Sequence, residues 1–150
     1  MKTSQKGIDL IKAFEGLSLK AYICPAGIAT IGYGHTENVV QGQRITEQIA
    51  EDLLKADLSD TEQGVSRLVR RKLSQYQFDA LVSFVYNCGT GNFLKSTLLK
   101  KVRINPNDPT IAAEFAKWIH AGGKPLEGLR RRRLAEAELY FTKEEKEGEE

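Results

Sequence analysis

The feature that most constrains the fold is the run FDALVSFV at residues 78–85, which is apolar on nearly every side of a helix. A helix of this kind has to be buried inside a larger structure. Ser74 followed by Gln77 has the spacing of a capping box, which predicts where the helix begins. The chain has 150 residues, enough for one domain with a hydrophobic core. The sequence therefore predicts a single domain organised around one central helix.

Amphipathic helical patterns lie on both sides of that run. We expect further helices over residues 4–14, from Thr46 through Leu68, over residues 93–104, from Asp108 through Ile119 and over residues 129–141. Gly64 weakens the prediction for the long helix, because glycine is a poor helix former. In the last helix Leu134, Ala137 and Phe141 are predicted to face inward, and Trp118 is predicted to lie in the core.

One stretch departs from the helical period. Residues 21–23 and 29–31 are short and β-prone, and the intervening Pro25-Ala26-Gly27 predicts a hairpin turn. We therefore expect an α+β fold over residues 1–142. Its small β-hairpin lobe, about residues 15–60, and its larger helical lobe, about residues 61–142 with the N-terminal helix, would be joined by the long helix.

Charge and composition narrow the function. Residues 143–150, KEEKEGEE, predict an acidic, disordered tail, whereas residues 1–142 carry 20 basic and 15 acidic groups. A basic body favours an anionic partner. No apolar run reaches the about 20 residues of a membrane-spanning helix, and the N-terminus lacks the apolar core of a signal peptide, so no membrane insertion is predicted. The two histidines have no ligands at zinc spacing, so no metal or cofactor is predicted.

Three polar side chains in and beside the predicted hairpin have a spacing that suggests chemistry. They are Glu15, Cys24 nine residues later and Thr30 six residues beyond that. Taken singly, such residues are usually a solvated glutamate, a small buried thiol and an ordinary strand threonine. Together they can converge on one cleft, with an acid on one side of a bond and an activated water on the other, as glycoside hydrolysis requires.

The stretch FEGLSLKAYICPAGIATIGYGHT at residues 14–36 resembles the active-site segment of the phage-type lysozymes, the muramidases of glycoside hydrolase family 24. Their pattern is a glutamate, eight residues, an aspartate or sometimes a cysteine, five residues and a threonine, followed by an IGYGHT-like string. The resemblance continues over residues 73–99 and 118–141. It implies the two-lobe lysozyme fold and hydrolysis of the β-1,4 bond between N-acetylmuramic acid and N-acetylglucosamine in peptidoglycan.

The resemblance also implies a role for each matching residue. Glu15 would be the general acid, which has to hold a proton near neutral pH and therefore calls for partly buried, less polar surroundings. Thr30 would orient the attacking water. Cys24 stands where the family more often has aspartate. It would act as a thiolate base, as a thiolate nucleophile that changes inversion to retention, or by position and polarity alone.

Further residues follow from the same resemblance. Asn87, Tyr33 and Arg131 are the candidate substrate-binding residues, with Arg131 near Glu15 and the other arginines of residues 130–133 facing an anionic wall polymer. His35 and Asp57 would form a structural pair.

The run of four arginines at residues 130–133 is also compatible with a nucleic-acid site or with a solvated surface. Clustered arginines bind phosphates, and a charged helix start often does no more than face solvent. No aromatic residues interleave the run as in a single-strand binder, so no nucleic-acid partner is predicted.

We expect a monomeric endolysin that stays in the host cytoplasm until a separate pore-forming protein releases it to the periplasm and cell wall. The alternative is a non-hydrolytic, peptidoglycan-binding relative of lysozyme, because Cys24 replaces the usual aspartate.

Overall fold

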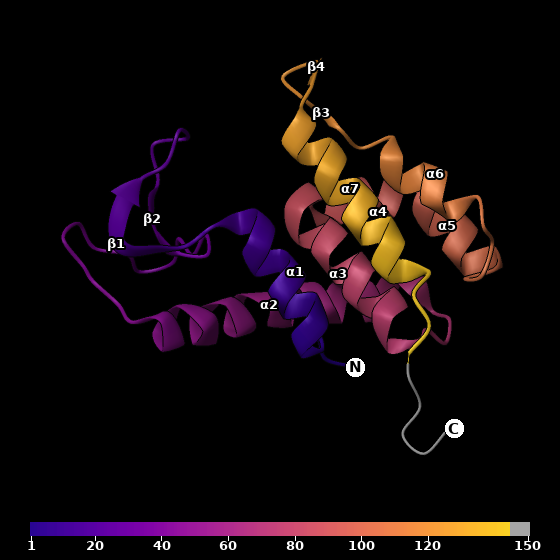
Figure 1. Cartoon of the computed structure of the whole chain (residues 1–150), viewed down its shortest axis with the longest axis horizontal. Coiled ribbons are helices and arrows are strands. Elements are labelled where there is room, and N and C mark those ends of the chain that lie inside the picture. Colours follow the sequence, from indigo (N-terminus) through magenta and orange to yellow (C-terminus); the bar gives the residue numbers. More distant parts are fainter. Residues whose placement is uncertain (145–150) are drawn as a thin grey trace.

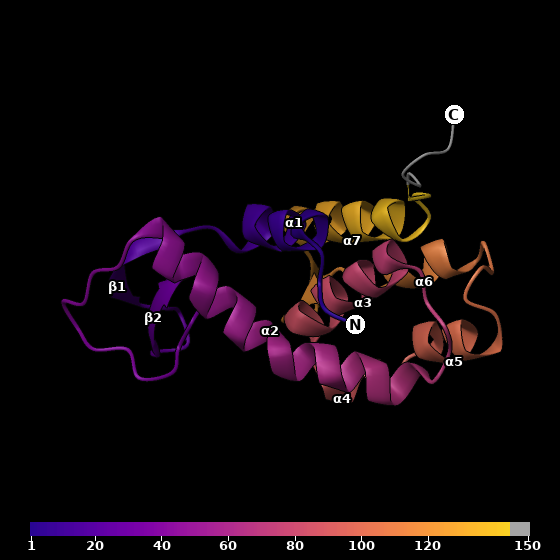
Figure 2. The ribbon, with the colours of Figure 1, turned by 90° about the horizontal axis from the view of Figure 1, so that it is seen from below.

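The longest helix, α2 (Glu47–Val69), runs from the β-hairpin at one end of the molecule to the helices at the other end (Figure 2). The computed structural model describes residues 1–144. The predicted tail therefore lies outside the described residues except for its first two positions. Thr46 caps α2 by accepting the amide of Ile49 at 3.2 Å. Gly64 does not interrupt the helix and is buried where α4 (Thr90–Lys95) packs against it.

The hairpin is formed by β1 (Ser18–Ile23) and β2 (Ala29–Gly32), which pair antiparallel with Tyr22 opposite Thr30. Cys24 begins the turn, and its carbonyl accepts the amide of Gly27 at 2.8 Å. The returning segment at residues 43–45 hydrogen-bonds to β1 through two backbone bonds of 2.9 Å. The predicted hairpin is thus present and has a further backbone segment along one side.

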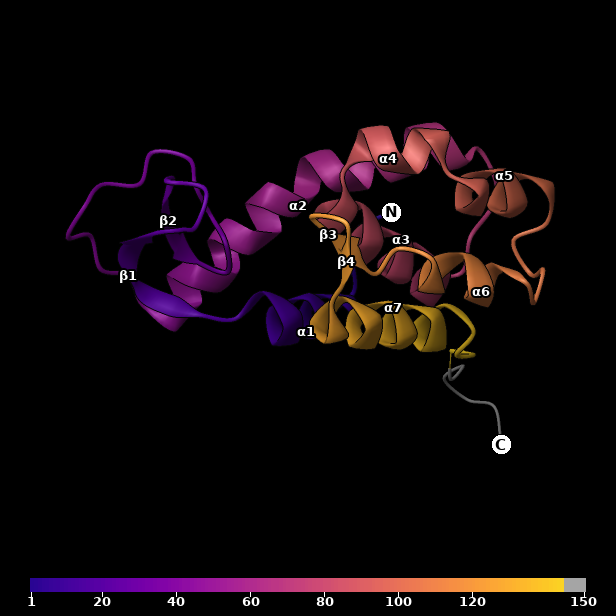
Figure 3. The same cartoon turned by 90° about the horizontal axis from the view of Figure 1, so that it is seen from above.

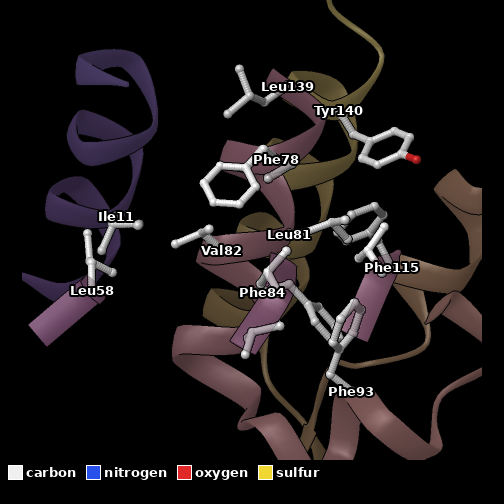
Figure 4. Close-up of a cluster of buried hydrophobic side chains, with 14 of the residues drawn as sticks. Ile11, Leu58, Phe78, Leu81, Val82, Phe84, Phe93, Phe115, Leu139 and Tyr140 are labelled. Atoms are coloured by element: carbon white, nitrogen blue, oxygen red, sulfur yellow. The ribbon is translucent and has the colours of Figure 1, made fainter. Parts of the chain in front are cut away.

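The central helix is α3 (Gln75–Cys88), which begins with the predicted capping box of Ser74 and Gln77. Around it lie α1 (Gln5–Glu15), α2 and α7 (Glu127–Tyr140) (Figure 1). Figure 4 shows the apolar side chains that fill the space between these helices. Phe84 makes edge-to-face contacts with Phe93, Phe115 and Trp118 at centroid distances of 5.7–6.1 Å. The core therefore forms around the apolar run that predicted it.

The prediction of one helix over residues 93–104 is wrong, because the structure has two helices there. α4 ends before Ser96, and α5 (Thr97–Ile104) follows it. Ser96 has extended backbone angles, and its hydroxyl oxygen accepts the amide of Leu99 at 3.0 Å. A buried serine that caps a new helix is what ends the continuous pattern.

The next predicted helix is shorter than expected. It was predicted from Asp108 through Ile119, but α6 spans only Ile111–Ala116. The Asp108 carboxylate accepts the amide of Thr110 at 2.9 Å, which forms a turn before the helix. A second small hairpin, β3 (His120–Ala121) and β4 (Lys124–Pro125), lies between α6 and α7.

The inward face of α7 is also different from the prediction. Leu134 and Phe141 are 50% and 40% exposed, although both were predicted to face inward; Ala137, the third residue of that prediction, packs partly buried against the core. The most deeply buried side chains of the helix include Arg132, Arg133 and Glu136. Leu139 and Tyr140 are buried as well, but the first half of this face is charged, so hydrophobic periodicity could not identify it.

The arrangement of helices with small antiparallel sheets confirms the predicted α+β class. Among the described residues, no helix has both the length and the apolar character needed to cross a bilayer.

α1 is tied to α3 at its start, where the Ser4 amide donates to the Asp79 carboxylate at 2.9 Å. Burial raises the pKa of Asp79, which is the acid at this helix junction.

Candidate active site

Glu15 is the last residue of α1, and Gly16 ends the helix with φ of 73°. Its side chain is 21% exposed, and Oε1 lies 2.7 Å from Nη1 of Arg132, which is 4% exposed. Figures 2 and 3 show α1 and α7 following one another along the same edge of the molecule. The glutamate is partly buried as expected, but its neighbour is a guanidinium group rather than an apolar wall.

Glu15 lies where two surface cavities meet. One cavity, ≈ 480 Å³, is polar and contains acidic side chains; its lining comprises Glu15, Gly34, Thr36, Glu37, Asp57, Tyr86 and Asn87. The other, ≈ 520 Å³, is basic and partly apolar; its lining comprises Ala13, Phe14, Glu15, Asn87, Leu126, Gly128, Leu129, Arg131 and Arg132. Glu15 and Asn87 line both cavities, so an extended ligand can occupy the space on either side of the Glu15 carboxyl group.

A tight turn brings backbone next to the free oxygen of Glu15. Ile31 and His35 exchange two backbone hydrogen bonds of 2.9 Å, which close the turn around Gly34. Gly34 has φ of 85°, in the left-handed region, and a Cβ atom there would lie 3.5 Å from Oε2 of Glu15. Glycine therefore allows the turn and leaves space beside Oε2.

His35 fastens this turn to the long helix. Its Nδ1 lies 2.8 Å from Oδ2 of Asp57, and its Nε2 lies 2.8 Å from the carbonyl oxygen of Glu37. Both ring nitrogens therefore face oxygen atoms, one on the long helix and one on the loop after the turn. The structure thus brings together His35 and Asp57, the two residues predicted to form a structural pair.

Behind Glu15, the inner face of α7 forms a buried ionic cluster. Arg132 Nε lies 3.3 Å from Oε2 of Glu136, and Arg133 Nε lies 2.8 Å from Oε1 of the same carboxyl group. The Ser83 hydroxyl on α3 donates to Oε2 at 2.5 Å. The Arg133–Oε1 contact is ionic and is not aligned as a hydrogen bond. The cluster holds Arg132 in the position from which it contacts Glu15.

The far end of the cluster reaches Asn87 and the second cysteine. Arg133 donates to Oδ1 of Asn87 at 2.7 Å and also to the sulfur of Cys88. Burial raises the pKa of the Cys88 thiol, although the Arg133 guanidinium opposes the shift. Asn87 is therefore oriented by a buried arginine while lining both cavities.

The hairpin side of the site carries Cys24 and Thr30. The Thr30 hydroxyl donates to the carbonyl of Ile28 at 2.9 Å. Hydrogen bonding lowers the pKa of the Cys24 thiol, with the backbone of Ile28 as the largest cause and the Thr30 side chain as a smaller one. Neither residue belongs to the lining of the two cavities at Glu15. The structure pairs Cys24 with Thr30, on the hairpin rather than beside the carboxyl group.

The family model described as phage lysozyme matches residues 12–136 of this chain, a range that contains all the predicted site residues. The chain belongs to the phage lysozyme family. This membership confirms the predicted identity, and it makes the protein a peptidoglycan-hydrolysing enzyme.

Individual relatives agree with this membership. The chain is 44% identical over 144 residues to the endolysin of Acyrthosiphon pisum secondary endosymbiont phage 1, covering 93% of this chain and 98% of that protein. It is 46% identical over 149 residues to the endolysin of Bacillus phage B103, covering 97% of this chain but only 56% of that longer relative. A crystal structure of a P22 lysozyme mutant superposes with a TM-score of 0.86 at 39% identity, covering 95% and 99% of the two chains. These matches confirm the predicted lysozyme-like fold.

The predicted substrate-binding residues of this phage lysozyme have different surroundings. Asn87 and Arg131 line cavities at Glu15. Tyr33 is buried in the hydrophobic core, with Nζ of Lys12 5.4 Å from its ring centroid, so its placement favours a structural role. Trp118, which was predicted to lie in the core, is partly buried and packs against the hydrophobic core.

The prediction for the arginine run needs a correction. Arg131 lines a cavity together with Glu15, but the arginine that contacts the carboxyl group is Arg132, and Arg133 is fully buried. Two of the four arginines are thus paired inside the protein instead of facing a wall polymer.

Sequence reasoning missed three residues of the site. Tyr86 lines the acidic cavity, and burial together with the nearby charges of Glu15 and Asp57 raises its pKa, which keeps the phenol protonated as a donor. Arg132 and Glu136 were missed because a helix rich in charged residues resembles a solvated surface. The one available signal was their spacing of four residues on one helix face.

Proposed function

We propose that this phage lysozyme is a muramidase that cleaves the β-1,4 bond between N-acetylmuramic acid and N-acetylglucosamine, with Glu15 as the general acid. The observation that carries the proposal is the position of Glu15 at the junction of two cavities, with one oxygen held by a buried arginine. Glycosidase acids protonate the departing oxygen and then become carboxylates.

The two oxygens of Glu15 would have different tasks. Oε1 bonds to Arg132, which fixes the orientation of the carboxyl group and stabilises the carboxylate that proton transfer leaves behind. Oε2 faces the space beside Gly34 and would carry the proton to the glycosidic oxygen. Gly34 would therefore act by leaving room for the sugar that approaches the acid.

Cys24 and Thr30 would activate and orient the water on the hairpin side of the bond. The lowered pKa of the Cys24 thiol increases its thiolate fraction near neutral pH, so it supports a role as the base. The Thr30 hydroxyl supplies the second polar group. Inversion at the anomeric carbon is expected for this arrangement, because a water rather than the sulfur would attack.

The glycan would lie along both cavities. Asn87 and the protonated Tyr86 offer donors to the N-acetyl and hydroxyl groups of the sugars, and Arg131 offers a positive charge to carboxylates of the wall polymer. We propose that the enzyme acts as a monomer, without inserting into the membrane, after a separate pore-forming protein has opened the route to the wall. Expression of this chain alone should leave cells intact until their inner membrane is breached.

Clearing of a peptidoglycan suspension tests the assignment of the acid. The wild type should clear the suspension, and Glu15→Gln should lose activity by at least about 100-fold, because general acid catalysis of this kind contributes about 10²–10⁴-fold. Glu138→Gln is the matched control, since Glu138 lies on the exposed face of α7. A wild type that binds the wall without releasing reducing sugar, or a fully active Glu15→Gln variant, would contradict the proposal.

A further inference from the structure

The buried cluster behind Glu15 contains a carboxyl group that the proposed reaction does not use. Glu136 is fully buried on α7 and contacts both Arg132 and Arg133. Arg132 in turn contacts Glu15 at 2.7 Å. A continuous series of ionic contacts therefore joins Glu136, Arg132 and the candidate acid.

The two arginines that contact Glu136 favour its ionised form. Oε2 accepts hydrogen bonds from the Ser83 hydroxyl at 2.5 Å, from Arg132 Nε at 3.3 Å and from Arg133 Nη2 at 3.3 Å. Oε1 faces Nε of Arg133 at 2.8 Å. Burial raises the pKa of Glu136, and the charges of Arg133 and Arg132 oppose that shift. The guanidinium groups can only donate, so the ionised carboxylate is the form that accepts from both arginines, while the Ser83 hydroxyl can donate or accept.

The charge of the cluster depends on this carboxylate. Two guanidinium groups contribute two positive charges, and Glu136 cancels one of them. The remaining positive charge balances an ionised Glu15, and it is uncompensated when Glu15 is protonated. Without the charge of Glu136, the same site would carry one more positive charge next to Glu15 and would favour the ionised acid more strongly.

Other titratable groups near the cluster are neutral, paired elsewhere, or line the two cavities beside it. On α3, Tyr86 and Cys88 both have a raised pKa and stay uncharged near neutral pH. On α6, which packs against α7, Glu114 is paired with Lys101 and Lys117. The acidic groups of the adjoining cavity are Asp57, which contacts His35, and Glu37, while Arg131 faces the other cavity.

We propose that Glu136 is a positioning residue for catalysis: it holds Arg132 on Glu15 and cancels one of the two buried arginine charges, which limits the positive charge that faces the acid. The inference rests on the proposed role of Glu15. It predicts that the limb of the pH–rate profile at high pH depends on the buried charge and not only on the groups that line the cavities.

Two substitutions of opposite sign test the proposal on the whole chain. Glu136→Gln makes the site more positive, so the high-pH limb of kcat/KM should move to lower pH by about one pH unit. Arg133→Gln makes the site more negative, so the same limb should move to higher pH by a similar amount. Glu138→Gln, on the exposed face of the same helix, should leave the limb in place.

The outcomes separate this inference from the proposed function. Circular dichroism and thermal melts first establish that each variant is folded at the assay temperature, and either folded variant alone decides the question. A loss of rate that is uniform across pH, or limbs that move in the same direction for both variants, would overturn the role of Glu136 and leave Glu15 as the acid. A wild type without hydrolytic activity, or an active Glu15→Gln, would instead remove the proposed function itself.

Discussion

Glu15 lies between two regions whose polar groups are held in different ways. On the α7 side, Arg132 and Glu136 are buried and have partners on three helices. On the hairpin side, the half-buried Cys24 at the start of the turn and the buried Thr30 on β2 are held by short-range bonds within residues 24–30, and Ile23 beside them is 61% exposed. An ionic network with partners on several helices fixes both geometry and charge, whereas local bonds within a hairpin fix geometry alone. Substitutions on the α7 side should therefore lower both the stability and the rate, and substitutions on the hairpin side should mainly lower the rate.

Arg132→Met should have the largest effect of the substitutions that probe this contrast. It leaves Glu136 with one arginine fewer and frees Glu15, and loss of one partner from a buried ion pair costs about 3–5 kcal/mol. Denaturant unfolding measures the stability, and wall clearing should fall together with it. Arg130→Met, at an exposed position of the same run, should cost less than about 1 kcal/mol. Equal losses of stability in the two variants would show that the buried ionic cluster contributes no more than an exposed ion pair.

Gly34→Ala tests the space beside the free oxygen of Glu15. The substitution should cost about 1–2 kcal/mol of stability, because φ is 85°, and should also lower kcat/KM by placing a methyl group near Oε2. Gly42→Ala is a matched control, since Gly42 has φ of 86° and open space around it. The control should show a similar loss of stability with unchanged kcat. If both variants keep full activity when folded, the space at Gly34 does not matter for the reaction.

Substitutions of Cys24 should change the rate with little effect on stability, because the side chain lies in a surface turn. Cys24→Ser should reduce kcat by at least about tenfold if the thiolate is the base, since a hydroxyl group does not ionise near neutral pH. Cys24→Asp should retain activity and extend it to lower pH, because a carboxylate loses its proton at lower pH than a thiol. An unimpaired serine variant would argue against both the thiolate base and the thiolate nucleophile. The anomer released first, followed by NMR, distinguishes inversion from retention.

Alkylation of the two cysteines needs no substitution and compares the hairpin side, which carries Cys24, with the α7 side, where Arg133 contacts Cys88. Cys24 has a lowered pKa and Cys88 a raised one, so at pH 7–8 the thiolate fraction is larger at Cys24. Iodoacetamide should modify Cys24 at least about tenfold faster, as measured by peptide mass spectrometry over time. Faster labelling of Cys88 would mean that the α7 side opens more readily than its buried contacts indicate.

Much of the architecture was readable in the sequence because it depends on local patterns. The apolar run of α3 with its capping box, the hairpin around Pro25 and the long helix after Thr46 all appear where their patterns predicted them. The split at Ser96 was missed, because a single capping hydroxyl interrupts an amphipathic pattern without changing its period. The motif spacing identified Glu15, Cys24 and Thr30 as candidates, but their roles stay predictions until the variants are measured.

By itself, the sequence determined the family, the central helix and the candidate acid, since each of these is written in consecutive residues. Tertiary structure alone decided what surrounds that acid. Which of four adjacent arginines reaches Glu15 depends on the rotation of α7 against α1 and α3, and on a serine hydroxyl 53 positions away from Glu136. Charged residues on a helix face outward unless the opposite wall supplies partners of the right sign, and only the folded chain brings those partners together.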